Sequence, residues 1–344
     1  MKILLIGGSG FIGPFTTAAL LKGGHHVTLF HRGKSKAPAG VEEILGDRQF
    51  LQDHQPEFRR QKFDVVVDFI LSSGRQAVQL MDTFRGVAGR VVALSSMDVY
   101  RAWGVFYGFE AGGLQELPVT EDSEVRTSRS VYSPEVLNRL RTIYPWVDEE
   151  YDKIPAELAV LGDSRLPGTV LRLPMIYGTG DPLHRFHNIL KRIHDGRKHI
   201  LFADDVARLR SPRGYVEDVG EAIALAASSP QAAGKIYNVS EAESFSELDW
   251  ARKIAEAAGW RGEFVVLPHD RAPQHLHSPG NTAQHLVASS ERIRKELGWR
   301  EVVPREEAFR RTIAWERAHV PEQPQPQFNY EAEDAALAEF KATA

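Results

Sequence analysis

Short apolar runs alternate with stretches of helical spacing along the first half of the chain. The apolar runs cover residues 2–6, 27–30, 41–45, 65–69, 91–95 and 169–173, and their length is typical of strands. Between them, residues 12–22 and 75–84 repeat apolar positions at the spacing of a helix. This alternation predicts an α/β fold with a doubly wound parallel sheet of the Rossmann type.

The pattern loosens after about residue 174, where longer loops separate the predicted elements. Helices are expected over residues 186–195, 217–227, 245–258 and 290–297, and strands over residues 235–240 and 263–268. We therefore expect a Rossmann domain over residues 1–173, with a return at about 213–240, and a smaller domain over residues 174–320. Residues 321–344 comprise a proline-rich linker, PEQPQPQ, and a tail that is either a short docked helix or disordered.

Composition narrows the class of protein. The 344 residues include no cysteine, which excludes disulfides, thiolate metal sites and a cysteine nucleophile. A formal net charge of −4 argues against a nucleic-acid partner, which usually requires a basic excess. No apolar run reaches the length of a membrane span, so we expect a cytoplasmic protein with no membrane partner. His184 and His187 lack a third ligand nearby, and no metal site is predicted.

The segment IGGSGFIG, residues 6–13, places three glycines between a predicted strand and a predicted helix. Glycine permits a tight turn, lets the backbone approach a phosphate and lets the helix pack against the strand. The helix N-terminus then presents N–H groups to an anion. A simple strand–helix turn is the alternative, but the position of the motif favours binding of a dinucleotide pyrophosphate. The expected contacts are Gly7, Ser9, Gly10, Phe11, Ile12 and Gly13.

The second predicted strand ends in the basic turn HRGKS, with no carboxylate. In NAD-binding Rossmann folds an acidic residue at this point holds the adenosine ribose, whereas cations suit a 2′-phosphate. His31, Arg32 and Lys34 therefore favour NADP over NAD, although NAD stays possible. The other interpretation is a solvated basic turn.

Further motifs follow in order along the chain. They are GD at 46–47, VVALSSMDVY at 91–100, KIPAE at 153–157, LRLPMIYGTGD at 171–181, YVEDVGEAI at 215–223, IYNVSEAESFSELD at 236–249 and RIRKELGW at 292–299. With the glycine loop, and over roughly residues 1–318, the chain resembles the extended short-chain dehydrogenase/reductases, the NAD-dependent epimerase/dehydratase family. Because FHRG replaces an acidic turn, it looks most like the atypical members, among which are plastid stem-loop RNA-binding proteins. The resemblance implies a small-molecule substrate, bound by the smaller domain, and a homodimer.

The resemblance also assigns roles to single residues. Asp47 would contact adenine, and Ser96 would hydrogen-bond the reacting oxygen. Lys153 would hold the nicotinamide ribose and lower the pKa of a tyrosine four residues earlier, since a neighbouring ammonium favours tyrosinate. The remaining expected contacts are Arg48 and Pro174 with the cofactor, and Met97, Tyr177 and Arg210 with the substrate.

The chain departs from the family at the tyrosine. Glu149 stands four residues before Lys153, and the nearby tyrosine is Tyr151, which a regular helix would turn away from the lysine. Pro155 is tolerated only in a first turn, so the helix either begins near Asp152, a good N-cap, or is kinked at Tyr151. Tyr151 and Glu149 are both candidates for proton transfer, and a site that only binds cofactor is the third possibility.

The segment between Ser96 and the tyrosine region is longer than the family usually has. Its aromatic side chains either form a lid over the site or pack beneath a long loop; they are Trp103, Phe106, Tyr107 and Phe109.

The leading hypothesis is an NAD(P)-dependent epimerase/dehydratase or reductase that transfers a hydride to or from a sugar-like or other carbinol or carbonyl substrate. In it, Ser96, Lys153 and either Tyr151 or Glu149 do the chemistry. A non-catalytic NAD(P)-binding sensor or scaffold is the alternative, and an RNA-binding member of the atypical group is a third.

Overall fold

A seven-stranded parallel sheet forms the centre of the computed structural model, which describes residues 1–34, 36–129, 132–322 and 328–343. The strand order is β10-β6-β5-β4-β1-β2-β3, and all neighbouring strands run parallel. The order reverses beside β1, as in a doubly wound fold. The strands are β1 (Lys2–Ile6), β2 (His26–His31), β3 (Glu42–Leu45), β4 (Val65–Asp68), β5 (Arg90–Ser96), β6 (Gly168–Leu173) and β10 (Ile236–Asn238). The fold class expected from the sequence is confirmed.

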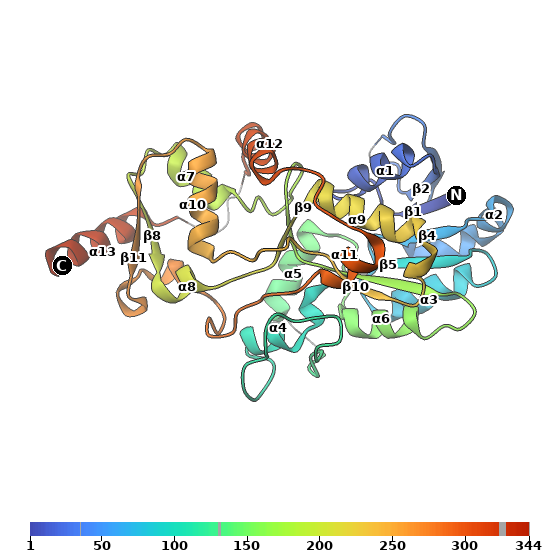
Figure 1. Ribbon diagram of the computed structural model, residues 1–344, viewed down its shortest axis with the longest axis horizontal. Coiled ribbons are helices and arrows are strands. Elements are labelled where there is room, and N and C mark those ends of the chain that lie inside the picture. Colours follow the sequence, from blue (N-terminus) through green and yellow to red (C-terminus); the bar gives the residue numbers. More distant parts are fainter. Residues whose placement is uncertain (35, 130–131, 323–327, 344) are drawn as a thin grey trace.

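Both faces of the sheet are covered, which explains why its central strands are mostly apolar rather than alternating, whereas the edge strand β3 has one buried residue, Ile44. On β1, Ile3 and Leu5 join one core, while Leu4 and Ile6 join the core on the opposite face. Figure 1 shows α1 (Gly13–Lys22) and α9 (Val216–Ser228) together at the top of the sheet, and α3 (Gly74–Phe84) and α6 (Lys153–Leu161) on its other side. The short α2 (Gln55–Gln61) adds Phe58 to the second core.

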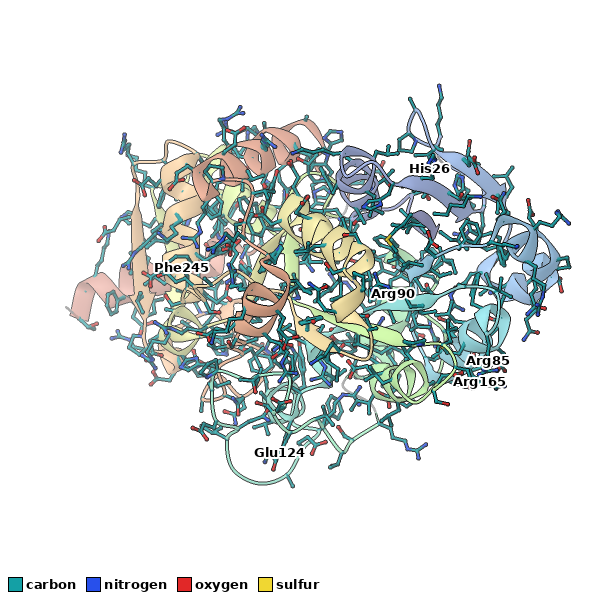
Figure 2. The ribbon with its side chains drawn as sticks, turned by 45° about the vertical axis from the view of Figure 1, so that its right-hand side comes forward. His26, Arg85, Arg90, Glu124, Arg165 and Phe245 are labelled. Carbon is teal, nitrogen blue, oxygen red and sulfur yellow. The ribbon has the colours of Figure 1, made fainter. Side chains whose placement is uncertain are left out.

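Arginines tie these layers together at the ends of the helices. Arg85, after α3, donates to Asp163 Oδ2 at 2.5 Å, and Asp163 follows α6. Arg90, at the start of β5, donates to the carbonyl of Ala226 at 2.9 Å near the end of α9. Figure 2 shows the two arginines on the side of the molecule that carries the sheet.

A smaller part of the molecule lies on the left of Figure 1, beyond the sheet. Its parallel strand pairs are β7 (Met175–Tyr177) with β9 (Arg213–Tyr215) and β8 (His199–Ala203) with β11 (Glu263–Leu267). Its helices are α7 (His187–His194), α8 (Asp204–Arg208), α10 (Glu247–Ala257) and α12 (Arg305–Ala318). The predicted helices at 186–195 and 245–258 and the strand at 263–268 match α7, α10 and β11, whereas β7, β8 and β9 were not expected. Helix α11 (Glu291–Leu297) packs instead beside β10.

The C-terminal tail is a docked helix, α13 (Tyr330–Thr343), at the far end of the smaller part (Figure 1). Leu337 packs into an apolar cluster with residues of β8 and β11. Glu333 is fully buried and accepts from Arg192 of α7 at 2.6 Å. Of the two possibilities for the tail, the docked helix is confirmed; most of the expected linker, residues 323–327, lies outside the described residues. No described helix combines the length and apolar character needed to cross a membrane.

The long insertion after β5 contains two helices, α4 (Arg101–Phe106) and α5 (Pro134–Ile143). Trp103 and Phe106 of α4 are buried in a cluster with Met97 and Tyr100. Tyr107 packs against this cluster, and Phe109 is 41% exposed. Three of the four aromatics, Trp103, Phe106 and Tyr107, therefore pack under the insertion, and none of the four lines the cavity described next, which contradicts the lid interpretation.

Candidate active site

A cavity of about 1380 Å³ opens at the carboxyl ends of β1, β2, β4, β5 and β6. Ligands of doubly wound sheets bind at this edge, where the strand order reverses. Every residue expected to contact the cofactor lines the cavity: Gly7, Ser9, Gly10, Phe11, Ile12, Gly13, His31, Arg32, Lys34, Asp47, Arg48, Lys153 and Pro174. The four expected catalytic residues, Ser96, Glu149, Tyr151 and Lys153, line it too. The sequence-derived set is thus brought together in one place.

The glycine loop has the geometry that a pyrophosphate requires. Gly7 has φ +75°, which side chains rarely adopt, and its N–H donates to the carbonyl of Phe30 at 3.1 Å. A Cβ on Gly13 would lie 2.0 Å from the carbonyl oxygen of Gly8, so only glycine lets α1 start this close to the loop. A Cβ on Gly10 would meet no atom within 4 Å. The space beside Gly10 is open to the cavity that it lines, and the loop fits an approaching phosphate.

The end of β2 offers two cations without partners. His31 is buried, and its Nε2 lies 2.8 Å from Glu43 Oε2, so its ring is held by the neighbouring strand β3. Arg32 and Lys34 are exposed, and no hydrogen bond or ion pair joins either to another described residue. These two side chains can move to meet an anion at the rim of the cavity.

Asp47 and Arg48 follow β3 at the same edge. Asp47 caps the 3₁₀ helix Arg48–His54, its Oδ1 accepting from the backbone N–H of Gln49 at 3.0 Å. Arg48 is buried and pairs with Asp68 Oδ2 at 2.7 Å, at the end of β4. Because its guanidinium also donates to the carbonyl of Gln76, Arg48 braces the wall of the cavity between two loops.

Helix α6 begins at Lys153, which is the first of the two alternatives that Pro155 left open. Asp152 is its N-cap and accepts from the N–H of Ile154 at 3.1 Å, which places Pro155 in the first turn. Lys153 Nζ donates to the backbone carbonyls of Leu71 and Leu94, the latter at 3.2 Å. Burial lowers the pKa of Lys153 to about 8, while the nearby Asp98 carboxylate opposes that change. The lysine sits between the loop after β4 and the end of β5 with its ammonium largely desolvated.

Tyr151, just before this helix, turns towards the cavity rather than following helical geometry. Lys153 Nζ lies 5.9 Å from the centre of its ring. Its hydroxyl donates to Asp98 Oδ2 at 2.7 Å. Burial and the adjacent Asp98 carboxylate raise the pKa of Tyr151 well above its ordinary value. The resemblance led us to expect a tyrosine biased towards tyrosinate by the lysine; the structure instead shows one held neutral by a carboxylate.

Glu149 lies on the exposed rim of the same cavity. No described residue hydrogen-bonds its side chain, and no ion pair links it to Lys153. Ser96, at the end of β5, accepts from the N–H of Asp98 at 3.2 Å through Oγ, which leaves its own O–H free to donate. The hydroxyl of the neighbouring Ser95, in contrast, donates to Glu157 Oε1 at 2.5 Å.

Two residues that the sequence did not single out complete this corner, Asp98 and Tyr132. Tyr132 lines the cavity, and its hydroxyl donates to Asp98 Oδ2 at 3.2 Å. Asp98 itself is 1% exposed, behind the two tyrosines. The signal available in the sequence was an aspartate two residues after Ser96, in the otherwise mostly apolar stretch SSMDVY.

The segment from Tyr132 to Glu149 covers one side of the cavity and contains α5. It is anchored on the loop after β4. Ser72 Oγ donates to the carbonyl of Trp146 at 3.4 Å and accepts from the N–H of Asp148 at 3.2 Å, while Ser73 Oγ donates to Asp148 Oδ2 at 2.6 Å. Trp146 then lies 5.4 Å from Lys153 Nζ, measured to the ring centre.

The three expected substrate contacts do not line the cavity, and this expectation is corrected. Met97 is 1% exposed because it packs under the insertion with Tyr100. Tyr177 is equally buried, and its hydroxyl donates to Glu241 Oε1 at 2.8 Å in the core of the smaller part. Arg210 is exposed outside the cavity, with its backbone N–H bonded to His285.

Comparisons with known proteins agree on one family. The sequence pattern of the NAD dependent epimerase/dehydratase family matches residues 149–240. A UDP-glucose 4-epimerase of Corynebacterium glutamicum is 27% identical over 87% of this chain and 90% of its own length. The Chloroplast stem-loop binding protein of 41 kDa b of Arabidopsis thaliana is 25% identical over 87% of this chain and 75% of its own.

Solved structures show the same fold. The UDP-glucose 4-epimerase of Thermus thermophilus, in complex with NAD, superposes with a TM-score of 0.63 over 93% of this chain and 100% of that chain, at 23% identity.

Proposed function

The chain belongs to the extended short-chain dehydrogenase/reductases, the NAD-dependent epimerase/dehydratase family, and from that premise we propose that it is an NADP-dependent enzyme that oxidises a carbinol or reduces a carbonyl by hydride transfer. One observation carries the proposal. Ser96, Tyr151 and Lys153 meet the glycine loop in one cavity at the switch point of the sheet, although up to 146 residues separate them along the chain.

Lys153 positions the cofactor in this proposal. An ammonium has three N–H donors, and two of them go to the carbonyls of Leu71 and Leu94. The third is available on the cavity side for a ribose hydroxyl of the nicotinamide nucleotide. The desolvated ammonium makes that hydrogen bond strong, because charge-assisted bonds gain from a low local dielectric.

Ser96 and Tyr151 act on the substrate oxygen. The free O–H of Ser96 donates to that oxygen and polarises it. Tyr151, which departs from the family position by two residues, exchanges the proton through its hydroxyl. The geometry favours it over Glu149, since Tyr151 is the one of the two that contacts Lys153 and is held in place by a hydrogen bond.

Bound dinucleotide would supply or accept the hydride at its nicotinamide ring. The glycine loop would hold its pyrophosphate, and Arg32 and Lys34 would meet a 2′-phosphate on the adenosine ribose. Among the described residues at the end of β2, no carboxylate is available to accept a hydrogen bond from the ribose hydroxyl, since Glu43 is paired with His31. We therefore propose NADP rather than NAD as the cofactor.

The substrate is proposed to be sugar-like or another small carbinol. Residues from the end of β6 onwards line the cavity with mostly apolar side chains and one cation, Arg185; they are Leu173, Pro174, Ile176, Gly180, Pro182, Leu183 and Arg185. Such a surface suits the carbon skeleton of a substrate. The guanidinium of Arg185 is already paired with Asp181, with Nη1 2.7 Å from Oδ1. Relatives of the chain include UDP-glucose 4-epimerases.

The test combines binding with turnover. Purified protein is titrated with NADPH and NADH by nicotinamide fluorescence, and is then mixed with NADP⁺ and UDP-glucose, glucose or a simple polyol. Tighter binding of NADPH and a time-dependent rise in the absorbance of reduced nicotinamide support the proposal. Binding that never leads to reduction with any carbinol favours the sensor alternative, and absence of binding refutes the proposal.

A further inference from the structure

Asp98 is a buried carboxylate that joins two tyrosines of the cavity. Its Oδ2 accepts from the hydroxyl of Tyr151 at 2.7 Å and from that of Tyr132 at 3.2 Å. Both tyrosines line the cavity, whereas Asp98 does not and is only 1% exposed. Asp98 is therefore linked to the cavity by its hydrogen bonds to the two tyrosine hydroxyls.

The other carboxylate oxygen has no partner. Asp98 Oδ1 is buried and accepts no hydrogen bond from any residue that the structure describes. An unsatisfied buried carboxylate oxygen is costly and needs an explanation. A purely structural acceptor for two tyrosines would not require a charged group, because a neutral amide oxygen accepts the same two bonds.

Two cations lie close to this carboxylate. Lys153 interacts with it electrostatically, and Arg126 donates through Nε to the backbone carbonyl of Asp98 at 3.0 Å. Tyr107 also faces Asp98 from α4's C-terminal end. Arg126 is itself paired with Asp152 at 2.7 Å, so the charged and titratable groups around Asp98 are Lys153, Arg126, Asp152 and the three tyrosines, and Lys153 offsets part of the cost of burying the Asp98 charge.

Building on the proposed function, we propose that Asp98 is the terminal proton acceptor of the site and that Tyr151 relays the proton to it. When a carbinol is oxidised, its O–H proton passes to the oxygen of Tyr151 while the phenolic proton of Tyr151 passes to Asp98 Oδ2. The C–H bond gives its electron pair, as hydride, to the oxidised dinucleotide. The substrate becomes a carbonyl, Tyr151 ends neutral, and Asp98 ends as a carboxylic acid; reduction runs the same steps backwards.

This relay replaces the mechanism that the family resemblance implies, in which the lysine favours the ionised form of the tyrosine. That mechanism fits the site poorly. Tyr151 donates to a carboxylate, and the raised pKa of Tyr151 disfavours its ionised form. Lys153 Nζ makes no hydrogen bond to Tyr151 and bonds instead to two backbone carbonyls. A neutral tyrosine can still transfer a proton when a base stands behind it, and Asp98 is in that place.

The first arm of the test uses the protein without cofactor. The alkaline titration of tyrosine absorbance is followed in the wild type, Asp98→Asn and Tyr107→Phe. Asparagine keeps the shape and an acceptor oxygen but loses the charge, so tyrosines now ionise at lower pH than in the wild type. Tyr107→Phe removes one phenol that makes no hydrogen bond to a described residue and does not line the cavity, and Tyr151 is expected to ionise as in the wild type. An unchanged titration in Asp98→Asn overturns the proposal.

The second arm measures the rate of carbinol oxidation against pH, with NADP⁺ and whichever probe the wild type oxidises. The wild-type rate is expected to fall at acid pH, because the relay works only while its acceptor is a carboxylate. Asp98→Asn is expected to be slower by ~10²–10⁴-fold and to lose this acidic limb, because its residual proton transfer no longer uses the carboxylate. Tyr107→Phe keeps both the rate and the limb.

Failure of the relay and failure of the proposed function give different results. If the wild type turns over and Asp98→Asn keeps its rate and its acidic limb, the relay is refuted while the hydride-transfer function stands. If no probe is oxidised, the proposed function fails and the relay falls with it. If Asp98→Asn does not fold, Tyr151→Phe takes its place, and the relay then requires the same loss of rate and acidic limb.

Discussion

Lys153→Met removes a buried ammonium while keeping an unbranched side chain of similar length. In the fold, burial lowers the pKa of Lys153 from 10.5 to about 8. Between those two values the unfolded chain keeps the proton on Lys153 and the folded chain does not. The unfolded state therefore binds more protons, and the free energy of unfolding rises with pH across this window.

The size of this effect follows from the same values. Each unit of pKa difference corresponds to ~1.4 kcal/mol, so the charged Lys153 costs the fold about 3 kcal/mol below pH 8. Most of that cost, about 2.5 kcal/mol, disappears between about pH 7 and about pH 10. The affinity for the dinucleotide is expected to fall over the same pH range, because in the proposed site the Lys153 ammonium donates to the ribose and that ammonium is lost.

Urea unfolding followed by circular dichroism measures this directly. The wild type is expected to gain about 2.5 kcal/mol between about pH 7 and about pH 10 relative to Lys153→Met. Exposed lysines and the tyrosines are common to both proteins, so the difference isolates Lys153. Parallel pH curves for the two proteins would refute the buried, desolvated ammonium and the role derived from it.

Three further predictions concern other parts of the molecule. Gly10→Val should abolish binding of NADPH in a folded protein, whereas Gly113→Val, at an exposed glycine with equal room for a side chain, should not; equal affinities in the two variants would contradict the loop assignment. Arg32→Asp should shift the ratio of dissociation constants from NADPH towards NADH, because a carboxylate repels a 2′-phosphate and accepts from a ribose hydroxyl; an unmoved ratio would show that another group reads the ribose. Glu333→Leu leaves Arg192 buried without its charge partner and should cost ~3–5 kcal/mol in denaturant unfolding, and a loss under about 1 kcal/mol would mean that α13 contributes little.

The sheet was predictable because its signals are local. Strands such as β1, β4 and β5 are nearly continuous apolar runs because the parallel sheet buries both of their faces, whereas the edge strand β3 buries only Ile44. The start of α6 was one of two local alternatives: the aspartate at 152 and the proline at 155 allowed a helix that begins near Asp152 or one kinked at Tyr151, and the structure shows the first. The positive φ of Gly7 follows from the same loop signature.

The contacts of Asp98 with the two tyrosines were not predictable, because the residues are distant in the sequence. Tyr151 and Asp98 are 53 residues apart, and nothing in the sequence pairs them. Tyr177 shows the opposite error: a motif position suggested a substrate contact, but the ring lies in an aromatic cluster with Phe186 and Trp250. Arg213 of β9 is also held by a distant partner, Glu247, at 2.6 Å. In each case a tertiary partner decides the role of a polar side chain.

Pairing between distant short strands was missed for the same reason. The strand at 263–268 was expected, but its partner β8 (His199–Ala203) contains only four consecutive apolar residues, and nothing local in that run indicates the pairing with a strand that begins at Glu263. The tail then packs on this small sheet through Leu337. Composition alone could not distinguish that docking from disorder.

The most direct test of the central claim is the single-turnover rate of hydride transfer, followed by nicotinamide absorbance in wild type, Tyr151→Phe and Glu149→Gln. With proton transfer at the Tyr151 hydroxyl, Tyr151→Phe should be ~10²–10⁴-fold slower while its affinity for NADPH barely changes, since Lys153 makes that contact. Glu149→Gln, on the exposed rim, should stay close to the wild type. A large loss in Glu149→Gln with a normal rate in Tyr151→Phe would contradict the account and move the chemistry to the carboxylate.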